Sequence, residues 1–114
     1  MATDPFLRVS LDGAEVVFIL GAEQDPETVE NVDVEVRLAD ESRWSATFVS
    51  LAEIGRIMDR WTTTGEGLRG RYFQCADLVI VREGGVPAMV EVVRGLLDAD
   101  DLRMVFVRLD EISE

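Results

Sequence analysis

Strict alternation of apolar and polar side chains over residues 32–38 is the feature that most constrains the fold. The apolar positions of this segment are Val32, Val34, Val36 and Leu38. A period of two places alternate side chains on opposite faces of a strand, so the segment predicts a β-strand with one buried face. The pattern returns over residues 43–49 after a polar turn at residues 40–42. Two such segments around a short turn predict an antiparallel pair.

The first 20 residues predict a second pair of strands. Two apolar runs between Phe6 and Leu20 are separated by Asp12-Gly13. This dipeptide readily adopts the positive φ angles of a two-residue turn, which predicts a β-hairpin. The run from Val16 to Leu20 is continuously apolar, and we expect it to form a central strand covered on both faces. The chain therefore begins with four antiparallel strands.

Two helices are expected after this block. Ser50 and Glu53 have the spacing of a capping box, which predicts a helix that continues to about Trp61. Residues 62–70 contain three threonines and three glycines and are expected to be a flexible connector. Pro87 suits the first turn of a second helix, whose apolar face runs from Val86 to Leu97. Strands are predicted at residues 71–74, at residues 77–81, which are expected to be buried, and at residues 104–109. An acidic tail follows over residues 110–114.

The predicted order of elements is β-β-β-β-α-β-β-α-β. Because the strands precede the first helix as a block, this order favours an α+β fold over an alternating α/β fold. We expect one mostly antiparallel sheet with two helices packed on one face. The length of 114 residues indicates a single domain over residues 1–114. A chain of this length can bury a core without a disulfide or a structural metal.

The charged residues exclude several kinds of chemistry. The formal net charge is −12, all 11 basic residues are arginines, and the sequence has no histidine. Without histidine there is no imidazole base and no histidine-ligated metal, and without lysine there is no Schiff base or phosphate-loop lysine. The single cysteine, Cys75, has no imidazole to activate it and is expected to fill apolar space. We therefore expect a protein that is not an enzyme and that has no cofactor and no metal.

Membranes and nucleic acids are not expected as partners. No apolar run approaches the ~20 residues that a membrane-spanning helix needs. Residues 1–5 lack the basic start and the apolar stretch of a signal peptide, which favours a cytoplasmic location. A net charge of −12 repels the phosphates of nucleic acids and the headgroups of anionic lipids.

Acidic side chains concentrated between the regular elements form the first candidate site. Such a surface attracts a basic protein partner and raises the rate of association. Solubility alone would also explain these charges. The candidate partner-binding residues are Glu23, Asp25, Glu27, Glu30, Asp98, Asp100 and Asp101.

A glycine-containing loop over residues 64–77 gives an alternative. It would be a pocket for an anion or small molecule, or the site of an enzyme, and its candidate residues are Glu66, Arg69, Arg71, Tyr72 and Asp77. A third hypothesis is an acidic homodimer with a structural or chaperone-like role, which an apolar patch on the open sheet face would favour. Trp44 and Trp61 share faces with other apolar residues and are expected in the core.

The sequence also resembles two groups of proteins. The first resemblance lies in the segment that begins Trp44-x-Ala46-Thr47-Phe48, continues through Ile57-Met58-x-x-Trp61 and ends at Asp77-Leu78-Val79-Ile80-Val81. This segment is similar to a family of small uncharacterised bacterial proteins. In its size, acidity and order of elements, the whole chain resembles the immunity proteins of bacterial polymorphic toxin systems. That resemblance implies a binding role, neutralisation of a basic toxin, and assigns no functional residue.

Overall fold

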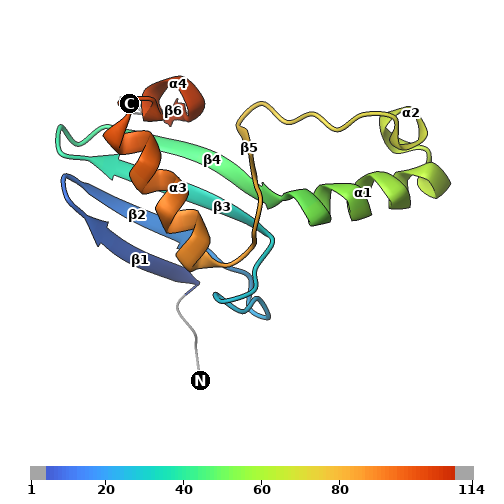
Figure 1. Cartoon of the computed structure of the whole chain (residues 1–114), viewed down its shortest axis with the longest axis horizontal. Coiled ribbons are helices and arrows are strands. Elements are labelled where there is room, and N and C mark those ends of the chain that lie inside the picture. Colours follow the sequence, from blue (N-terminus) through green and yellow to red (C-terminus); the bar gives the residue numbers. More distant parts are fainter. Residues whose placement is uncertain (1–4, 110–114) are drawn as a thin grey trace, which may run out of the picture.

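Four strands form an antiparallel meander at the start of the chain. The structure is a computed structural model that describes residues 5–109. Each strand pairs with its neighbour in sequence (Figure 1). They are β1 (Phe6–Leu11), β2 (Ala14–Ile19), β3 (Asn31–Leu38) and β4 (Arg43–Ser50). Gly13 turns the first hairpin with a φ of 82°. The predicted hairpin and the two predicted alternating strands are confirmed.

Two short strands pair with the edge of β4 that faces away from β3. β5 (Leu78–Val81) pairs in parallel with residues 47–50, and β6 (Val107–Leu109) pairs antiparallel with residues 43–45. Since β3 holds the opposite edge of β4, the two short strands share one edge, one at each end. The described residues thus form a six-stranded, mostly antiparallel sheet, and the predicted α+β class is confirmed.

The two long helices lie in different places. α3 (Val86–Asp98) crosses one face of the sheet, and its buried residues Val86, Met89, Val90 and Val93 join the main core (Figure 1). α1 (Leu51–Thr64) instead continues from β4 beyond the end of the sheet. Its buried residues Ile54 and Ile57 lie outside the main core cluster. The prediction that two helices pack on one face of the sheet is therefore correct for α3 only. α1 is instead part of a projection from the sheet.

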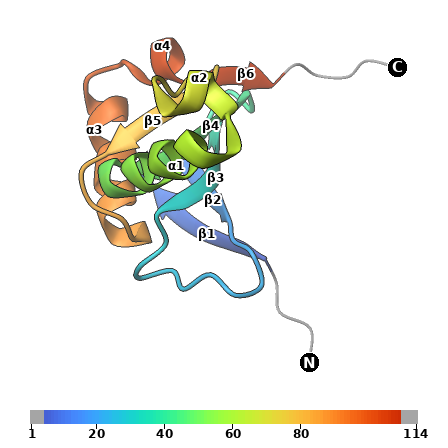
Figure 2. The same cartoon turned by 90° about the vertical axis from the view of Figure 1, so that its right-hand side faces the viewer.

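This projection, which we call the arm, consists of α1, α2 (Glu66–Gly70) and the connector over residues 71–77 (Figure 2). Trp61 stacks on Phe73 with ring centroids 5.4 Å apart, which holds the connector against α1. The prediction of a strand at residues 71–74 is wrong, because these residues belong to the connector and form no strand. Residues 62–70 are also not an irregular connector, since residues 62–64 complete α1 and residues 67–70 form a left-handed turn with positive φ.

Three further strand predictions need correction. β2 is covered on one face only, because α3 crosses that face of the sheet and the opposite face, where Ile19 is exposed, is open. β5 begins at Leu78 and is an edge strand with an exposed Ile80. Residues 102–105 form α4 (Leu102–Val105), so the last strand begins only at Val107. The acidic tail predicted for residues 110–114 lies outside the described residues.

The start of α1 is capped, although not by a complete capping box. The Ser50 hydroxyl accepts a hydrogen bond from the Glu53 N–H at 3.1 Å, as predicted. The Ser50 N–H donates to the carbonyl oxygen of Glu30 at 2.8 Å, and the Glu53 carboxylate binds Arg56. α1 extends past the predicted end at Trp61 and is closed by Gly65, whose φ is 95°.

Substitutions at two glycines with open surroundings distinguish the effect of helix propensity on stability from the effect of backbone strain. Gly55 lies exposed inside α1, and a Cβ built on it meets nothing within 4 Å. Gly55→Ala is therefore expected to raise the free energy of unfolding by about 0.5–1 kcal/mol. Gly65 has equally open space but a positive φ, so Gly65→Ala is expected to lower it by about 1–2 kcal/mol. Urea unfolding measures both, and a loss of stability in Gly55→Ala would contradict the expectation.

Candidate functional site

Residues 21–30, which we call the acidic loop, carry exposed carboxylates on Glu23, Asp25 and Glu27. Hydrogen bonds within the loop define its path. The Gln24 side chain accepts from the Gly21 N–H at 2.7 Å and donates to the carbonyl oxygen of Asn31 at 3.0 Å. An Asp25 carboxylate oxygen accepts from the Glu27 N–H at 2.9 Å. The carboxylates therefore stand on an ordered loop.

The acidic loop is also bound to the start of α3. The Gly85 N–H donates to the carbonyl oxygen of Val29, and the Val86 N–H donates to that of Pro26, both at 2.7 Å. The approach is close because residue 85 has no side chain: a Cβ there would lie 2.5 Å from the carbonyl oxygen of Glu27. Residues 85 and 86, which are far from the loop in the sequence, thus hold it at Pro26 and Val29.

A shallow depression of about 310 Å³ lies beside the acidic loop. Its walls are Glu23, Gln24, Asp25, Thr28, Val29, Glu30, Asn31 and Glu53. Glu30 accepts from the Ser50 hydroxyl at 2.7 Å and pairs with Arg56 at 2.8 Å, and these contacts lower the pKa of its carboxyl, the Ser50 bond most. Arg56 also pairs with Glu53 at 3.0 Å. Within residues 5–109 no arginine pairs with Glu23 or Asp25, so these carboxylates dominate the charge.

The second group of predicted acidic residues lies at the other end of α3 (Figure 1). Asp98 is the last residue of α3, Asp100 has a φ of 61°, and Asp101 precedes α4. α3 has 13 residues and is about 20 Å long at 1.5 Å per residue. The seven predicted residues therefore form two separate acidic surfaces.

Near this second group, a hydrogen-bonded network fixes Trp44. The Trp44 indole N–H donates to the Ser42 hydroxyl at 2.9 Å, and that hydroxyl donates to Asp40 at 2.5 Å. The bonds from Ser42, and secondarily the guanidinium of Arg103, lower the pKa of Asp40 to about 2. The guanidinium carbons of Arg103 and Arg108 lie 5.6 and 5.7 Å from the Trp44 ring centroid. Trp44 is a core residue, as predicted, whereas Trp61 packs inside the arm.

The structure does not gather the residues of the alternative pocket. Glu66 and Arg69 lie in α2 at the tip of the arm, and Arg71 and Tyr72 follow them, all exposed. Asp77 lies at the base of the arm, where it accepts from Thr47 at 3.4 Å and from the Cys75 thiol at 3.2 Å. The length of α1 separates the tip from the base (Figure 1). These five side chains therefore do not converge on one cavity.

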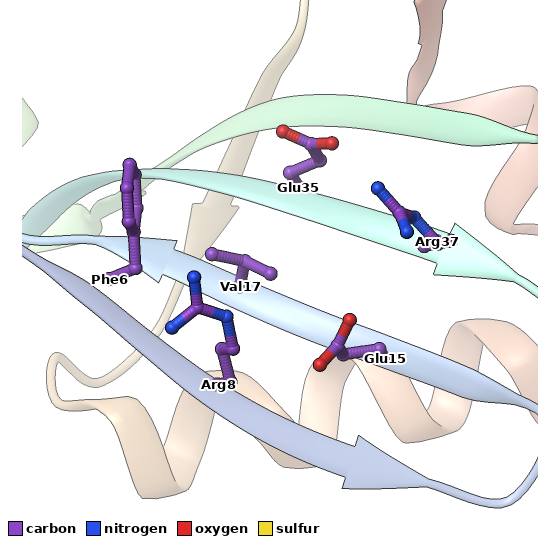
Figure 3. Close-up of a pocket in the computed structure, with 6 residues that line it drawn as sticks. All are labelled: Phe6, Arg8, Glu15, Val17, Glu35 and Arg37. Atoms are coloured by element: carbon purple, nitrogen blue, oxygen red, sulfur yellow. The ribbon is translucent and has the colours of Figure 1, made fainter.

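Sequence reasoning missed a pocket of about 320 Å³ on the open face of β1, β2 and β3. Figure 3 shows its six lining residues, which are Phe6, Arg8, Glu15, Val17, Glu35 and Arg37. Along each strand these residues alternate with residues of the core, so the period-two pattern of the sequence could have indicated that they share the open face. Two arginines and two glutamates balance the charge here, so this pocket lacks the single sign of the acidic loop.

The acidic loop can attract and hold basic side chains, because its unpaired carboxylates are fixed and exposed. Within residues 5–109, no group of three or more cysteine, aspartate or glutamate side chains is arranged to hold a metal ion. In the same part of the chain, no helix has the length and apolarity to cross a bilayer. Comparisons with protein-family models, with curated proteins and with solved structures find no match.

Proposed function

We propose that the chain is a non-enzymatic protein-binding domain that docks a basic partner on the acidic loop. The observation that carries this proposal is the pair of exposed carboxylates, Glu23 and Asp25, that line a depression on a loop held by hydrogen bonds. A preorganised loop loses little conformational freedom when it binds, which favours affinity. The net charge of −12 would also steer a basic partner toward the chain.

The most specific form of this proposal is an immunity protein of a bacterial toxin system, acting in the cytoplasm. An acidic surface can occupy the basic site through which a nuclease binds the phosphates of nucleic acid. The resemblance in size, acidity and order of elements supports this form. The hypothesis of a small-molecule site has less support, because its residues are divided between the tip and the base of the arm.

A charge-matched pair of variants tests the docking surface. The loop variant combines Glu23→Gln, Asp25→Asn and Glu27→Gln, and the control combines Asp98→Asn, Asp100→Asn and Asp101→Asn. Both remove three charges, so both weaken the long-range field equally. With a fluorescent nona-arginine peptide as the probe, the loop variant is expected to bind about 10-fold more weakly than the wild type. The control is expected to bind within about 3-fold of it.

The dissociation constants are measured by fluorescence anisotropy at two salt concentrations. Affinity of the wild type is expected to fall as salt rises, because exposed charges are screened. Equal losses in the two variants would show that only the net charge matters and would contradict the proposed docking surface.

A further inference from the structure

The face of the sheet opposite α3 carries balanced charges, although the chain as a whole has a formal net charge of −12. On β1 to β4, every second residue points to this open face, because the residues between them belong to the core. Three arginines and three acidic residues occupy the open positions. They are Arg8, Arg37, Arg43, Glu15, Asp33 and Glu35. Two copies of the chain can therefore bring their open faces together without a local excess of negative charge.

Apolar side chains on the same face are exposed to solvent. Phe6 and Ile19 lie directly opposite each other on β1 and β2 and are 41% and 38% exposed. Val17 follows on β2 and, with Phe6, lines the pocket of about 320 Å³ (Figure 3). Removal of these side chains from water would favour contact with a second surface.

The area of the open face is sufficient for an interface. The sheet is five strand positions wide, since β5 and β6 share one edge of β4. With strands about 4.8 Å apart and about 20 Å long, the sheet covers about 500 Å² in plan. A specific interface needs about 1,000 Å² in total, half of it from each partner. Two open faces packed together meet this requirement.

Two charged residues of the open face have no ionic partner within residues 5–109. Glu15 on β2 and Arg37 on β3 lie directly opposite each other in the register of the sheet. They nevertheless form no ion pair with each other, and Figure 3 shows their charged groups apart. Glu35, by contrast, pairs with Arg43 at 3.4 Å. Glu15 and Arg37 therefore offer opposite charges to a partner.

We propose that two copies of the chain form a dimer by packing their open faces together around a two-fold axis. The axis runs along the strands between β2 and β3, so β2 of each copy lies opposite β3 of the other. Because Glu15 and Arg37 lie at the same level along these strands, Glu15 of each copy meets Arg37 of the other copy. A two-fold interface requires such complementarity of a surface with itself. Packed sheets keep their strand directions within about 30° of each other, a deviation that these long side chains can follow.

Charge reversal at these two positions tests the contact between copies. Glu15→Arg and Arg37→Glu each place like charges opposite one another, so either variant alone is expected to dimerise about 10-fold more weakly than the wild type. An equimolar mixture restores both pairs of opposite charges and is expected to dimerise within about 3-fold of the wild type. Mixing changes no contact within a chain, so this recovery can come only from contact between copies. Circular dichroism spectra establish that both variants are folded.

The same reversals in α3 give a matched control. Glu91 and Arg94 are exposed, pair at 3.5 Å and belong to the helix that covers the other face of the sheet. Glu91→Arg and Arg94→Glu change the net charge as the test variants do, so they change the long-range repulsion between copies equally. Both are expected to dimerise within about 3-fold of the wild type. The loop variant at residues 23, 25 and 27 is expected to do the same, because the dimer uses none of its carboxylates.

Sedimentation velocity between about 1 and 500 µM protein gives the dissociation constants. A wild type that is monomeric at about 500 µM overturns the dimer. Reversed variants that dimerise like the wild type, or a mixture that stays monomeric, overturn the contact of Glu15 with Arg37. Loss of dimerisation in the loop variant alone would place the contact on the acidic loop and also overturn the proposal. A loop variant that loses the nona-arginine probe but still dimerises supports two separate surfaces.

Discussion

Replacing Phe48 with alanine is expected to lower the free energy of unfolding by about 3–5 kcal/mol, the range for removing a buried phenyl ring. Phe48 is 0% exposed and lies in β4, the strand that pairs with β3, β5 and β6. Its ring meets that of Phe106 edge to face, with centroids 5.8 Å apart. The substitution therefore removes apolar burial and leaves a cavity where the two halves of the chain meet.

The matched control for this prediction is Phe6→Ala. Phe6 has the same side chain but is 41% exposed in β1, and its loss is expected to cost about 1 kcal/mol. Urea unfolding followed by far-ultraviolet circular dichroism gives both free energies. Comparable losses at the two positions would show that burial at Phe48 does not decide the stability of the sheet.

Gly85→Ala is expected to destabilise the fold by about 3 kcal/mol and to weaken binding on the acidic loop. Gly85 has a φ of 94° and a ψ of 141°, a combination that residues with a Cβ rarely adopt. The added Cβ would also lie 2.5 Å from the carbonyl oxygen of Glu27. Either the backbone at residue 85 or the acidic loop must move, and the hydrogen bond to Val29 stretches with it.

Gly95→Ala, inside α3, is the control, and its expected effect on stability has the opposite sign. Gly95 is exposed inside α3 and has open space around it, so alanine is expected to add about 0.5–1 kcal/mol. Unfolding by urea and affinity for the nona-arginine probe are measured for both variants. If Gly85→Ala matches the wild type in both, the contact between the loop and the start of α3 does not position the carboxylates.

The parts of the fold that follow from the sequence are those that local pattern determines. Period-two alternation predicted β3 and β4, and Pro87 with its apolar face predicted α3. The left-handed turn in the arm could not be predicted in this way, because Leu68 and Arg69 adopt positive φ that neither side chain favours. In the same turn, a Cβ on Gly67 would lie 2.6 Å from the Trp61 ring and 2.8 Å from the carbonyl oxygen of Tyr72, so the turn has no space for a side chain there.

The candidate site was predictable only as a set of residues. Composition identified the carboxylates of the acidic loop, but their fixed positions depend on Gly85 and Val86, which lie more than 50 residues away in the sequence. The length of α3 separates Asp98 from this loop, which the alternation and charge patterns do not reveal.

The order of strand pairing has a consequence for how the chain folds. Strands β1 to β4 pair with sequence neighbours, so their contacts are more local than those of β5 and β6 and can form early. β5 follows the arm in the chain and β6 follows α3 and α4, so their contacts with β4 close longer loops and are expected to form later. Until then, β4 presents a complete unpaired edge to other chains. Resistance to aggregation during folding therefore depends on how rapidly the C-terminal half docks onto β4.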